Sequence, residues 1–297
     1  MIFDETTIRK LNQLTLVANK VRAGAIKGER RSARRGSSVE FADYRNYIPG
    51  DDLRRLDWNI YARLEKPFIK LLEEEEDLAV HVLVDTSASM GWGEGAQNKH
   101  LYALHLAAAL SAVALGAGDH LTVAALNATH ATGAVPMQFG PARGSQHLLR
   151  LMALLEQWQP AGETDLSAAL RAYLLMPRRA GLCFVISDLF SPAGHQAGLR
   201  ELQSRGFEVN LLHLLAPDEI DPPLAGDLRL VDVETGQAQE VSVEAGMRDL
   251  YRQRVQAWQD GIMAECMQRG VRYIPVSTAQ PWDELVLLGL RRAGVMK

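Results

Sequence analysis

The chain has 297 residues, apolar side chains make up 47% of it, and its formal net charge is −4. This composition is that of an ordinary globular protein with a sizeable core, which excludes a disordered or low-complexity chain. The two cysteines, Cys183 and Cys266, belong to no C-x-x-C or Cys/His motif, so we expect buried, inert thiols. Residues 1–20 are polar and mixed in charge, unlike a signal peptide. We therefore expect a cytoplasmic protein that is not bound to a membrane.

Charge is distributed unevenly along the chain. Residues 1–70 hold 15 Lys and Arg against 9 Asp and Glu, whereas residues 71–297 hold 17 against 27. The basic side chains of the first part are concentrated in residues 22–35. Such a run can contact nucleic acid or an acidic partner, but a solvated or internally paired loop is the favoured interpretation.

The first part of the chain shows weak signals of regular structure. Apolar residues near helical spacing predict an amphipathic helix over Thr7–Val21. The Gly-, Ser- and Arg-rich stretch Gly24–Ser38 is typical of a loop. Aromatic and charged residues are mixed in Glu40–Asp57, which indicates a compact irregular segment rather than regular structure.

From Leu78 onward, strand and helix patterns alternate regularly. Short apolar runs predict strands at Leu78–Val84, Leu121–Leu126, Leu182–Ser187, Val209–Leu215 and Val271–Val276. Helices are predicted at Lys99–Leu115, Ser145–Trp158, Asp165–Met176, Gln196–Arg205 and Met247–Arg269, with a last short helix from Pro281 to Leu290. An extra hairpin is predicted at Leu228–Val233 and Glu240–Val243. The alternation predicts an α/β fold with a parallel sheet covered by helices on both faces.

Polar side chains follow the first core strand immediately. Asp85, Ser87 and Ser89 occupy alternate positions of the sequence Asp-Thr-Ser-Ala-Ser, directly after the strand Leu78–Val84. A carboxylate and two hydroxyls are hard oxygen donors, which suit Mg²⁺ or Ca²⁺ better than zinc or copper. In an open α/β sheet, ligands bind outside the carboxyl ends of the strands, which is where this segment lies.

Two further segments are predicted to lie at the same edge of the sheet. Asp165 is a natural N-cap for the helix that follows it, which leaves Thr164 in the loop just before that helix. Asp188 follows the apolar strand Leu182–Ser187, as Asp85 follows its own strand. We therefore expect Asp85, Ser87, Ser89, Thr164 and Asp188 to converge on one divalent-cation site, for Mg²⁺, Mn²⁺ or Ca²⁺.

Such a site can bind a protein without doing chemistry. Three neutral hydroxyls and two carboxylates leave a bound cation with much of its positive charge, so the cation attracts an anionic oxygen from outside. A Glu or Asp of another protein can supply that oxygen. The alternative is purely structural: Ser87 and Ser89 cap a following helix, and Asp85 satisfies backbone donors in a turn.

Two resemblances rest on these and nearby residues. The first is to the metal-ion-dependent adhesion site of a von Willebrand factor A domain, which these residues resemble: Asp85-x-Ser87-x-Ser89, Thr164 and Asp188. The second is to the bacterial "domain of unknown function" family fifty-eight. Its signature resembles the following motifs of this sequence: Glu40-Phe41, Tyr44-Arg45-Asn46-Tyr47, Pro49-Gly50-Asp51-Asp52, Arg54, Leu56-Asp57-Trp58 and Ala62-Arg63. The C-terminal third adds Asp232-x-Glu234-Thr235-Gly236, Tyr251 and Gly270-x-x-Tyr273.

The resemblance implies a fold, a partner and a domain organisation. The fold would be a Rossmann-like von Willebrand factor A domain with a family-specific N-terminal element and an inserted hairpin. The partner would be a MoxR-type AAA+ ATPase, beside which such proteins are often encoded. The expected boundaries are 1–77 for the N-terminal element, 78–278 for the A domain with the hairpin near 217–246, and 279–297 for the C-terminal helix.

Two other functions remain as alternatives. A strand that ends in Asp also resembles the start of a haloacid-dehalogenase phosphatase site, but the general acid expected two residues later is here Ser87. The chain also lacks the Walker A, H-E-x-x-H and G-x-S-x-G motifs, so we expect no enzyme. The second alternative is nucleic-acid binding through residues 22–35, with the nearby aromatic side chains stacking on bases. The overall acidic charge argues against it.

Overall fold

The computed structural model describes residues 5–11, 13–18, 39–48, 51, 53, 56–74, 78–126, 137–163, 165–223, 226–234, 236–243 and 246–297. The chain forms two compact units. One unit consists of residues 28–77, and the other combines residues 1–27 with residues 78–297. The basic segment 22–35, the predicted loop over 24–38 and Thr164 all lie outside the described residues.

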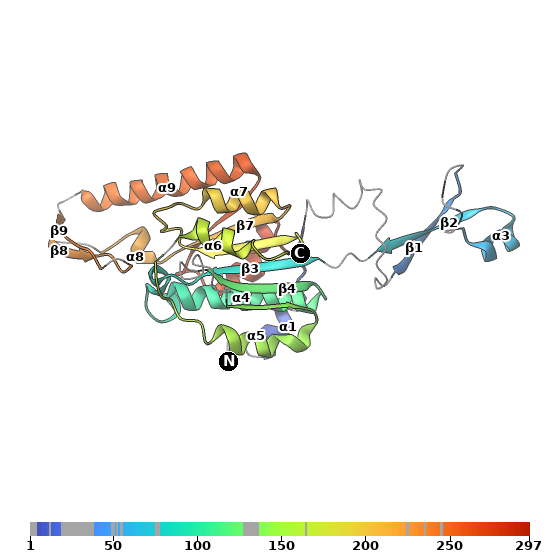
Figure 1. Cartoon of the computed structure of the whole chain (residues 1–297), viewed down its shortest axis with the longest axis horizontal. Coiled ribbons are helices and arrows are strands. Elements are labelled where there is room, and N and C mark those ends of the chain that lie inside the picture. Colours follow the sequence, from blue (N-terminus) through green and yellow to red (C-terminus); the bar gives the residue numbers. More distant parts are fainter. Residues whose placement is uncertain are drawn as a thin grey trace. The chain divides into compact units, whose positions relative to one another are not determined.

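The larger unit is built on a mostly parallel six-stranded sheet (Figure 1). Its strands are β3 (Ala79–Asp85), β4 (His120–Leu126), β5 (Gln138–Ala142), β6 (Leu182–Ser187), β7 (Glu208–Leu215) and β10 (Arg272–Ser277). They are ordered β10-β7-β6-β3-β4-β5, and only the edge strand β5 runs antiparallel to its neighbour. Counted within the sheet, this order is 3-2-1-4-5-6 read from the β5 edge, as in doubly wound folds. The predicted mostly parallel sheet is confirmed.

Helices cover both faces of this sheet (Figure 1). One face packs against α1 (Glu5–Leu11), α4 (Lys99–Gly116) and α5 (Leu148–Leu155), and the other against α6 (Leu166–Tyr173), α7 (Gln196–Ser204) and α9 (Met247–Arg269). On β3, Val82 belongs to the first apolar cluster and Leu83 to the second, and both are fully buried. A strand that is covered on both faces needs apolar residues at every position, which explains the continuous run in the sequence.

The N-terminal helix is shorter than predicted. Helix α1 ends at Leu11, whereas the sequence pattern predicts a helix over Thr7–Val21. Beyond it, the Thr15 amide donates to Lys297 O and the Lys297 amide donates back to Thr15 O, at 3.2 and 2.9 Å. This pairing with the end of the chain buries Leu16 and replaces the helix. Residues 1–27 therefore group with residues 78–297, not with the remainder of the expected 1–77 element.

The smaller unit contains a two-stranded antiparallel sheet. Its strands are β1 (Val39–Asn46) and β2 (Phe68–Glu74), and α3 (Trp58–Leu64) lies between them in the sequence. The prediction of irregular structure over Glu40–Asp57 is thus wrong for its first part. The register shifts between Phe41 and Asp43, which interrupts the two-residue alternation by which a strand is recognised in a sequence. Asp57 accepts from two amides at the start of α3 and caps that helix.

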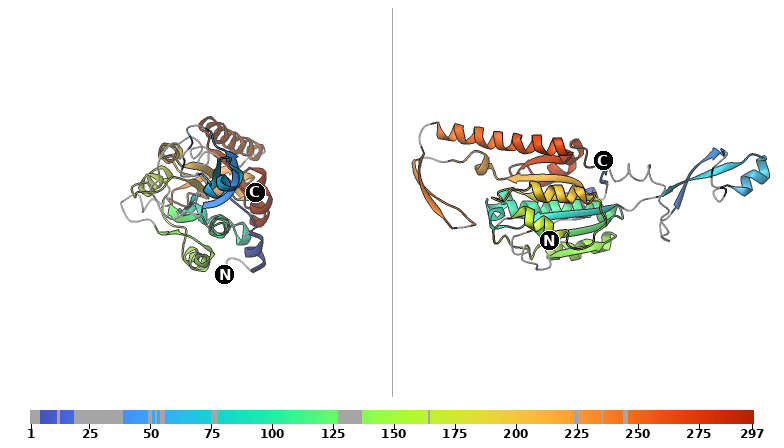
Figure 2. Two further views of the ribbon diagram at one scale, coloured as in Figure 1. Left: turned by 90° about the vertical axis from the view of Figure 1, so that its right-hand side faces the viewer. Right: turned by 45° about the horizontal axis from the view of Figure 1, so that its top comes forward.

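The C-terminal third adds the predicted hairpin and the long helix. Strands β8 (Gly226–Val231) and β9 (Ala238–Val243) pair antiparallel and are preceded by the short helix α8 (Pro217–Ile220). Figure 2 shows the hairpin beside the N-terminal end of α9. The chain ends in α10 (Trp282–Glu284), η6 (Leu285–Gly289) and α11 (Leu290–Arg292). None of the described helices combines the length and apolarity needed to cross a membrane.

Candidate metal centre

Asp85 and Asp188 lie where the strand order of the sheet reverses. Asp85 is the last residue of β3, and Asp188 directly follows the neighbouring parallel strand β6. The connections that leave these two strands run in opposite directions along the sheet. Ligands of doubly wound folds bind at this switch point, outside the carboxyl ends of the strands. Asp85 and Asp188 are 1% and 0% exposed, so their charges are removed from bulk water.

The turn after β3 presents the two predicted serines. The Ser87 amide donates to Asp85 Oδ1 at 3.0 Å, and the Ser87 and Ser89 hydroxyl oxygens lie 3.1 Å apart. Ser89 lies in the 3₁₀ turn η2 (Ala88–Gly91), and both serines are buried. The structure therefore brings Asp85, Ser87 and Ser89 together.

The loop that carries Thr164 is attached to this turn. The Ala88 amide donates to Gly162 O, and the Ala161 amide donates to Thr86 O, each at 2.9 Å. Asp165 caps α6 by accepting from the Ala168 amide at 2.8 Å, as predicted. The loop thus meets the turn after β3 on one side and begins α6 on the other, although Thr164 itself lies outside the described residues.

Each carboxylate is held by neighbours that sequence reasoning did not select. The Ser187 hydroxyl donates to Asp85 Oδ2 at 2.6 Å and accepts from the Leu189 amide at 3.0 Å. Asp188 Oδ1 accepts from the Phe190 amide at 3.1 Å. Ser187 is the last residue of β6, and its position beside a strand-terminal Asp is the signal that could have identified it.

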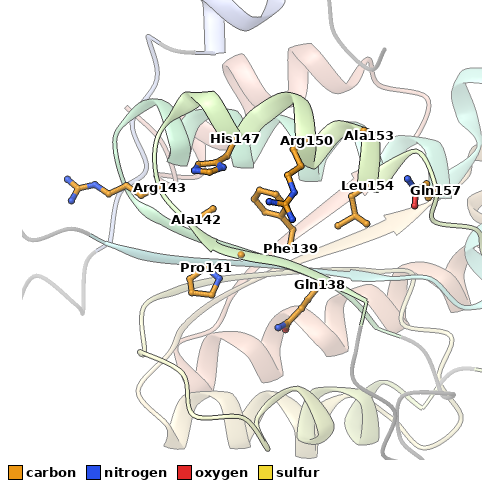
Figure 3. A pocket seen from close by; sticks show the side chains of 11 residues that line it. Gln138, Phe139, Pro141, Ala142, Arg143, His147, Arg150, Ala153, Leu154 and Gln157 are labelled. Atoms are coloured by element: carbon orange, nitrogen blue, oxygen red, sulfur yellow. The ribbon is translucent and has the colours of Figure 1, made fainter.

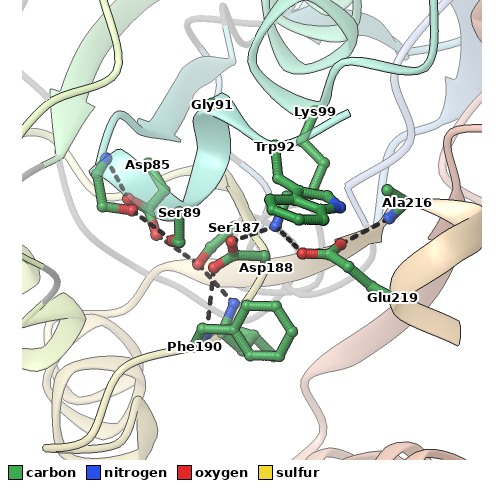
Figure 4. A network of polar contacts seen from close by, with 12 residues as sticks. Asp85, Ser89, Gly91, Trp92, Lys99, Ser187, Asp188, Phe190, Ala216 and Glu219 are labelled. Atoms are coloured by element: carbon green, nitrogen blue, oxygen red, sulfur yellow. Dashed lines mark hydrogen bonds and ion pairs between the residues drawn. The ribbon is translucent and has the colours of Figure 1, made fainter. Parts of the chain in front are cut away.

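A buried lysine is the largest addition to the predicted site. Lys99 Nζ donates to Asp188 Oδ2 and to Glu219 Oε1, both at 2.6 Å (Figure 4). The side chains of Lys99, Asp188 and Glu219 are 0%, 0% and 13% exposed. Glu219 Oε2 accepts from the Ala216 amide at 2.8 Å, and the Lys99 ammonium lies 4.9 Å from the centre of the Phe190 ring.

The sequence contains a signal for Lys99 that lies outside the predicted motifs. Lys99 is the first residue of α4, a helix whose remaining residues carry no Asp, Glu, Lys or Arg. A cation at a helix N-terminus is disfavoured by the helix dipole. A lysine in that position therefore indicates a carboxylate partner elsewhere in the fold.

In its fully ionised form, this cluster of described residues holds more negative than positive charge. Ionised, the three carboxylates of Asp85, Asp188 and Glu219 and the ammonium of Lys99 carry a formal charge of −2. Burial, together with the charge of Asp188, raises the pKa of Asp85 to about 7. Burial also raises the pKa of Glu219, against the opposing effect of Lys99. A divalent cation would neutralise the cluster.

The donor chemistry therefore fits a hard divalent ion. Among the described residues, no group of three or more His, Cys, Asp or Glu side chains could hold a metal ion. The candidate donors here are instead two carboxylates, Asp85 and Asp188, supplemented by the hydroxyls of Ser87 and Ser89.

A separate pocket lies at the β5 edge of the sheet (Figure 3). It encloses about 820 Å³ between β5 and α5 and is lined in part by Phe139, Arg143, His147 and Arg150. None of the predicted site residues lines it, so it plays no part in the candidate metal centre.

Comparison with known proteins places the sequence among bacterial relatives. A family model described as "Protein of unknown function DUF58" matches residues 43–260. An uncharacterized protein of Mycobacterium bovis is 30% identical over 299 residues, covering 99% of this chain and 93% of that protein. An uncharacterized protein of Mycobacterium avium is 28% identical over 162 residues, covering 52% of this chain and 95% of that protein.

A solved structure shows a weaker similarity. It is the crystal structure of an aerotolerance-related membrane protein from Bacteroides fragilis NCTC 9343 with multiple mutations to serines. The TM-score is 0.42 at 16% sequence identity, and the match covers 73% of this chain and 98% of that chain.

Proposed function

The chain belongs to the DUF58 family of proteins of unknown function, and we propose that it is a divalent-cation-dependent protein-interaction module. In this proposal the α/β unit is a von Willebrand factor A-like domain with a metal-ion-dependent adhesion site. Asp85, Ser87, Ser89, Thr164 and Asp188 hold Mg²⁺, Mn²⁺ or Ca²⁺ there. An acidic residue of another protein completes the coordination of the cation.

The observation that carries the proposal is the cluster of buried carboxylates at the switch point of the sheet. Asp85 and Asp188 come from neighbouring parallel strands and are both buried. In proteins, burying an ionised carboxylate without a compensating cation costs a free energy on the order of several kcal/mol. Lys99 pairs with Asp188 and Glu219, so the cluster of described residues carries a formal charge of −2 when all three carboxylates are ionised, which a dication would match.

The surrounding residues hold the carboxylates in place for this task. The Ser87 amide and the Ser187 hydroxyl each fix one oxygen of Asp85, and the Phe190 amide fixes one oxygen of Asp188. A bound Mg²⁺ would supply a positively charged coordination position for an anionic oxygen of the partner. The proposal includes no catalytic residue.

The partner in this proposal is a MoxR-type AAA+ ATPase or its client protein. The sequence resemblance supports this choice, as does the preference of a charged metal centre for an acidic side chain. The module would present a client to the ATPase in the cytoplasm during assembly or maturation of another protein.

The test compares binding of a purified MoxR-type ATPase from the same genome in Mg²⁺ and in EDTA. We expect the wild-type chain to retain the ATPase in Mg²⁺ only, and Asp85→Ala to retain none in either buffer. Asp221→Ala is the matched control, because Asp221 pairs with the exposed Arg248 and is not a proposed metal ligand. Equal retention by all variants in both buffers would contradict the proposal.

A further inference from the structure

Lys99 shares a carboxylate with the proposed metal centre. Its ammonium donates to Asp188 Oδ2 and to Glu219 Oε1 at the same distance of 2.6 Å. We propose that Lys99 is a tethered cation that competes with the divalent ion for Asp188, and that Glu219 retains its ammonium when the ion binds. This inference rests on the proposed function and adds a regulatory element to the same site.

The competition follows from charge and position. Lys99 and the dication would both be attracted to Asp188, and two cations on one carboxylate repel each other. The Lys99 side chain is fully buried, so water screens this repulsion poorly. Any gain in the ion's interaction with Asp188 therefore weakens the interaction of Lys99 with the same carboxylate.

Glu219 makes the exchange possible without leaving a buried ammonium unpaired. Its Oε1 accepts from Lys99, while its Oε2 accepts from the Ala216 amide at 2.8 Å, so the carboxylate is fixed from its other side. A buried ammonium with a single partner would lose that partner to the metal, at a cost of several kcal/mol in general. With two acceptors, Lys99 stays paired whether or not Asp188 is shared.

The competition for Asp188 also connects the metal centre to helix α8. Glu219 lies in α8. Its backbone carbonyl oxygen accepts from the hydroxyl of Tyr251 in α9 at 2.9 Å. The neighbouring Asp218 accepts from Trp92 Nε1, one residue beyond the 3₁₀ turn that carries Ser89. A change in the Lys99–Glu219 pair therefore acts on a short helix that contacts both α9 and the turn after β3.

The test measures Mg²⁺ binding alone by isothermal titration calorimetry on the full chain. Removing the competing cation in Lys99→Met should tighten Mg²⁺ binding by about tenfold, within the range usual for coupled sites. Glu219→Gln should weaken binding several-fold, because Lys99 then has Asp188 as its remaining charged partner. The matched control is Asp221→Asn, directly after the same helix, which should bind Mg²⁺ like the wild type because its carboxylate pairs with the exposed Arg248.

The opposite signs distinguish competition from a merely structural role, which would weaken binding in both variants. Unchanged or weaker binding in Lys99→Met overturns the inference and leaves the proposed metal centre in place. Absence of Mg²⁺ binding in the wild type and in every variant overturns both. If Lys99→Met does not fold without metal, Glu219→Gln decides: weaker binding supports the inference, and unchanged or tighter binding overturns it.

Discussion

Strand β3 carries two buried polar groups that differ in how they are balanced. His81, near its start, has both ring nitrogens paired, Nδ1 with the Tyr173 hydroxyl at 2.7 Å and Nε2 with Arg179 O at 3.0 Å. Burial lowers the pKa of His81 to about 4, so the ring is neutral near pH 7. Asp85, at the end of the same strand, belongs to a cluster that carries a formal charge of −2 when its three carboxylates are ionised.

The difference separates a structural polar group from a site. A buried group that serves packing is neutral and fully hydrogen-bonded, because an unpaired charge in the core is costly. When fully ionised, the cluster around Asp85 holds three carboxylates against the ammonium of Lys99 among the described residues. Such a cluster makes the carboxyl end of β3 the candidate site.

The largest effect is expected from removing Lys99, the cation that pairs with Asp188 and Glu219. In EDTA, Lys99→Met leaves Asp188 and Glu219 without their ammonium and should lower the free energy of unfolding by about 4 kcal/mol. Urea unfolding measures this loss, and added Mg²⁺ should reduce it. A small loss in EDTA would mean that the cluster carries less negative charge than its fully ionised form.

A smaller effect of opposite sign is expected from Asp85→Asn. The pKa of Asp85 is raised from 3.8 to about 7 in the folded state. The cost of ionising Asp85 therefore builds up between these two pH values and is complete above about pH 7. At about pH 8 in EDTA the variant should therefore be more stable by about 3 kcal/mol, after allowance for weakened hydrogen bonds. Thermal unfolding with and without Mg²⁺ checks this, since the wild type alone should gain stability from the ion. A destabilised variant in EDTA would contradict the expectation.

The balanced end of β3 should respond to acid rather than to metal. The pKa of His81 is lowered from 6.5 to about 4 in the folded state, so its contribution is complete above pH 6.5 and is lost as the pH falls toward 4. Between about pH 7 and pH 5 this group alone should remove about 2 kcal/mol of stability. Urea unfolding of the wild type and of His81→Gln at both pH values isolates the difference. If the free energy of unfolding changes equally between the two pH values in both proteins, His81 is not the group responsible.

The smallest effect is expected at an exposed ion pair near the site. Arg248 donates to Asp221 Oδ1 at 2.6 Å, with side chains that are 51% and 35% exposed. Water screens such pairs, so Arg248→Met should leave the urea midpoint almost unchanged. A loss comparable with that of Lys99→Met would show that burial is not what distinguishes the charged cluster.

Local sequence patterns determined much of the larger unit and most of the candidate site. The apolar runs of β3 and β6 and the full extent of α9 could be predicted because their periodicity lies within a single segment. Asp85 and Asp188 could be placed together because parallel strands end at one edge of a sheet.

Elements whose stability comes from a distant partner could not be predicted in this way. The edge strand β5 contains Gly140 and Pro141, which are turn signals in the sequence and are tolerated in a strand only at an edge. Strand β1 depends on pairing with β2, and the segment around Leu16 depends on the end of the chain. In each case a long-range pairing outweighed the local preference.

The sequence by itself determined which candidate ligand side chains stand at the ends of β3 and β6, since residue identity and strand position are both local properties. Only the tertiary structure decided how those charges are balanced. Lys99 and Glu219 lie 120 positions apart and meet at 2.6 Å, with Asp188 on the same ammonium. Coulomb interactions depend on distance in space and on burial, and neither is written in the local sequence.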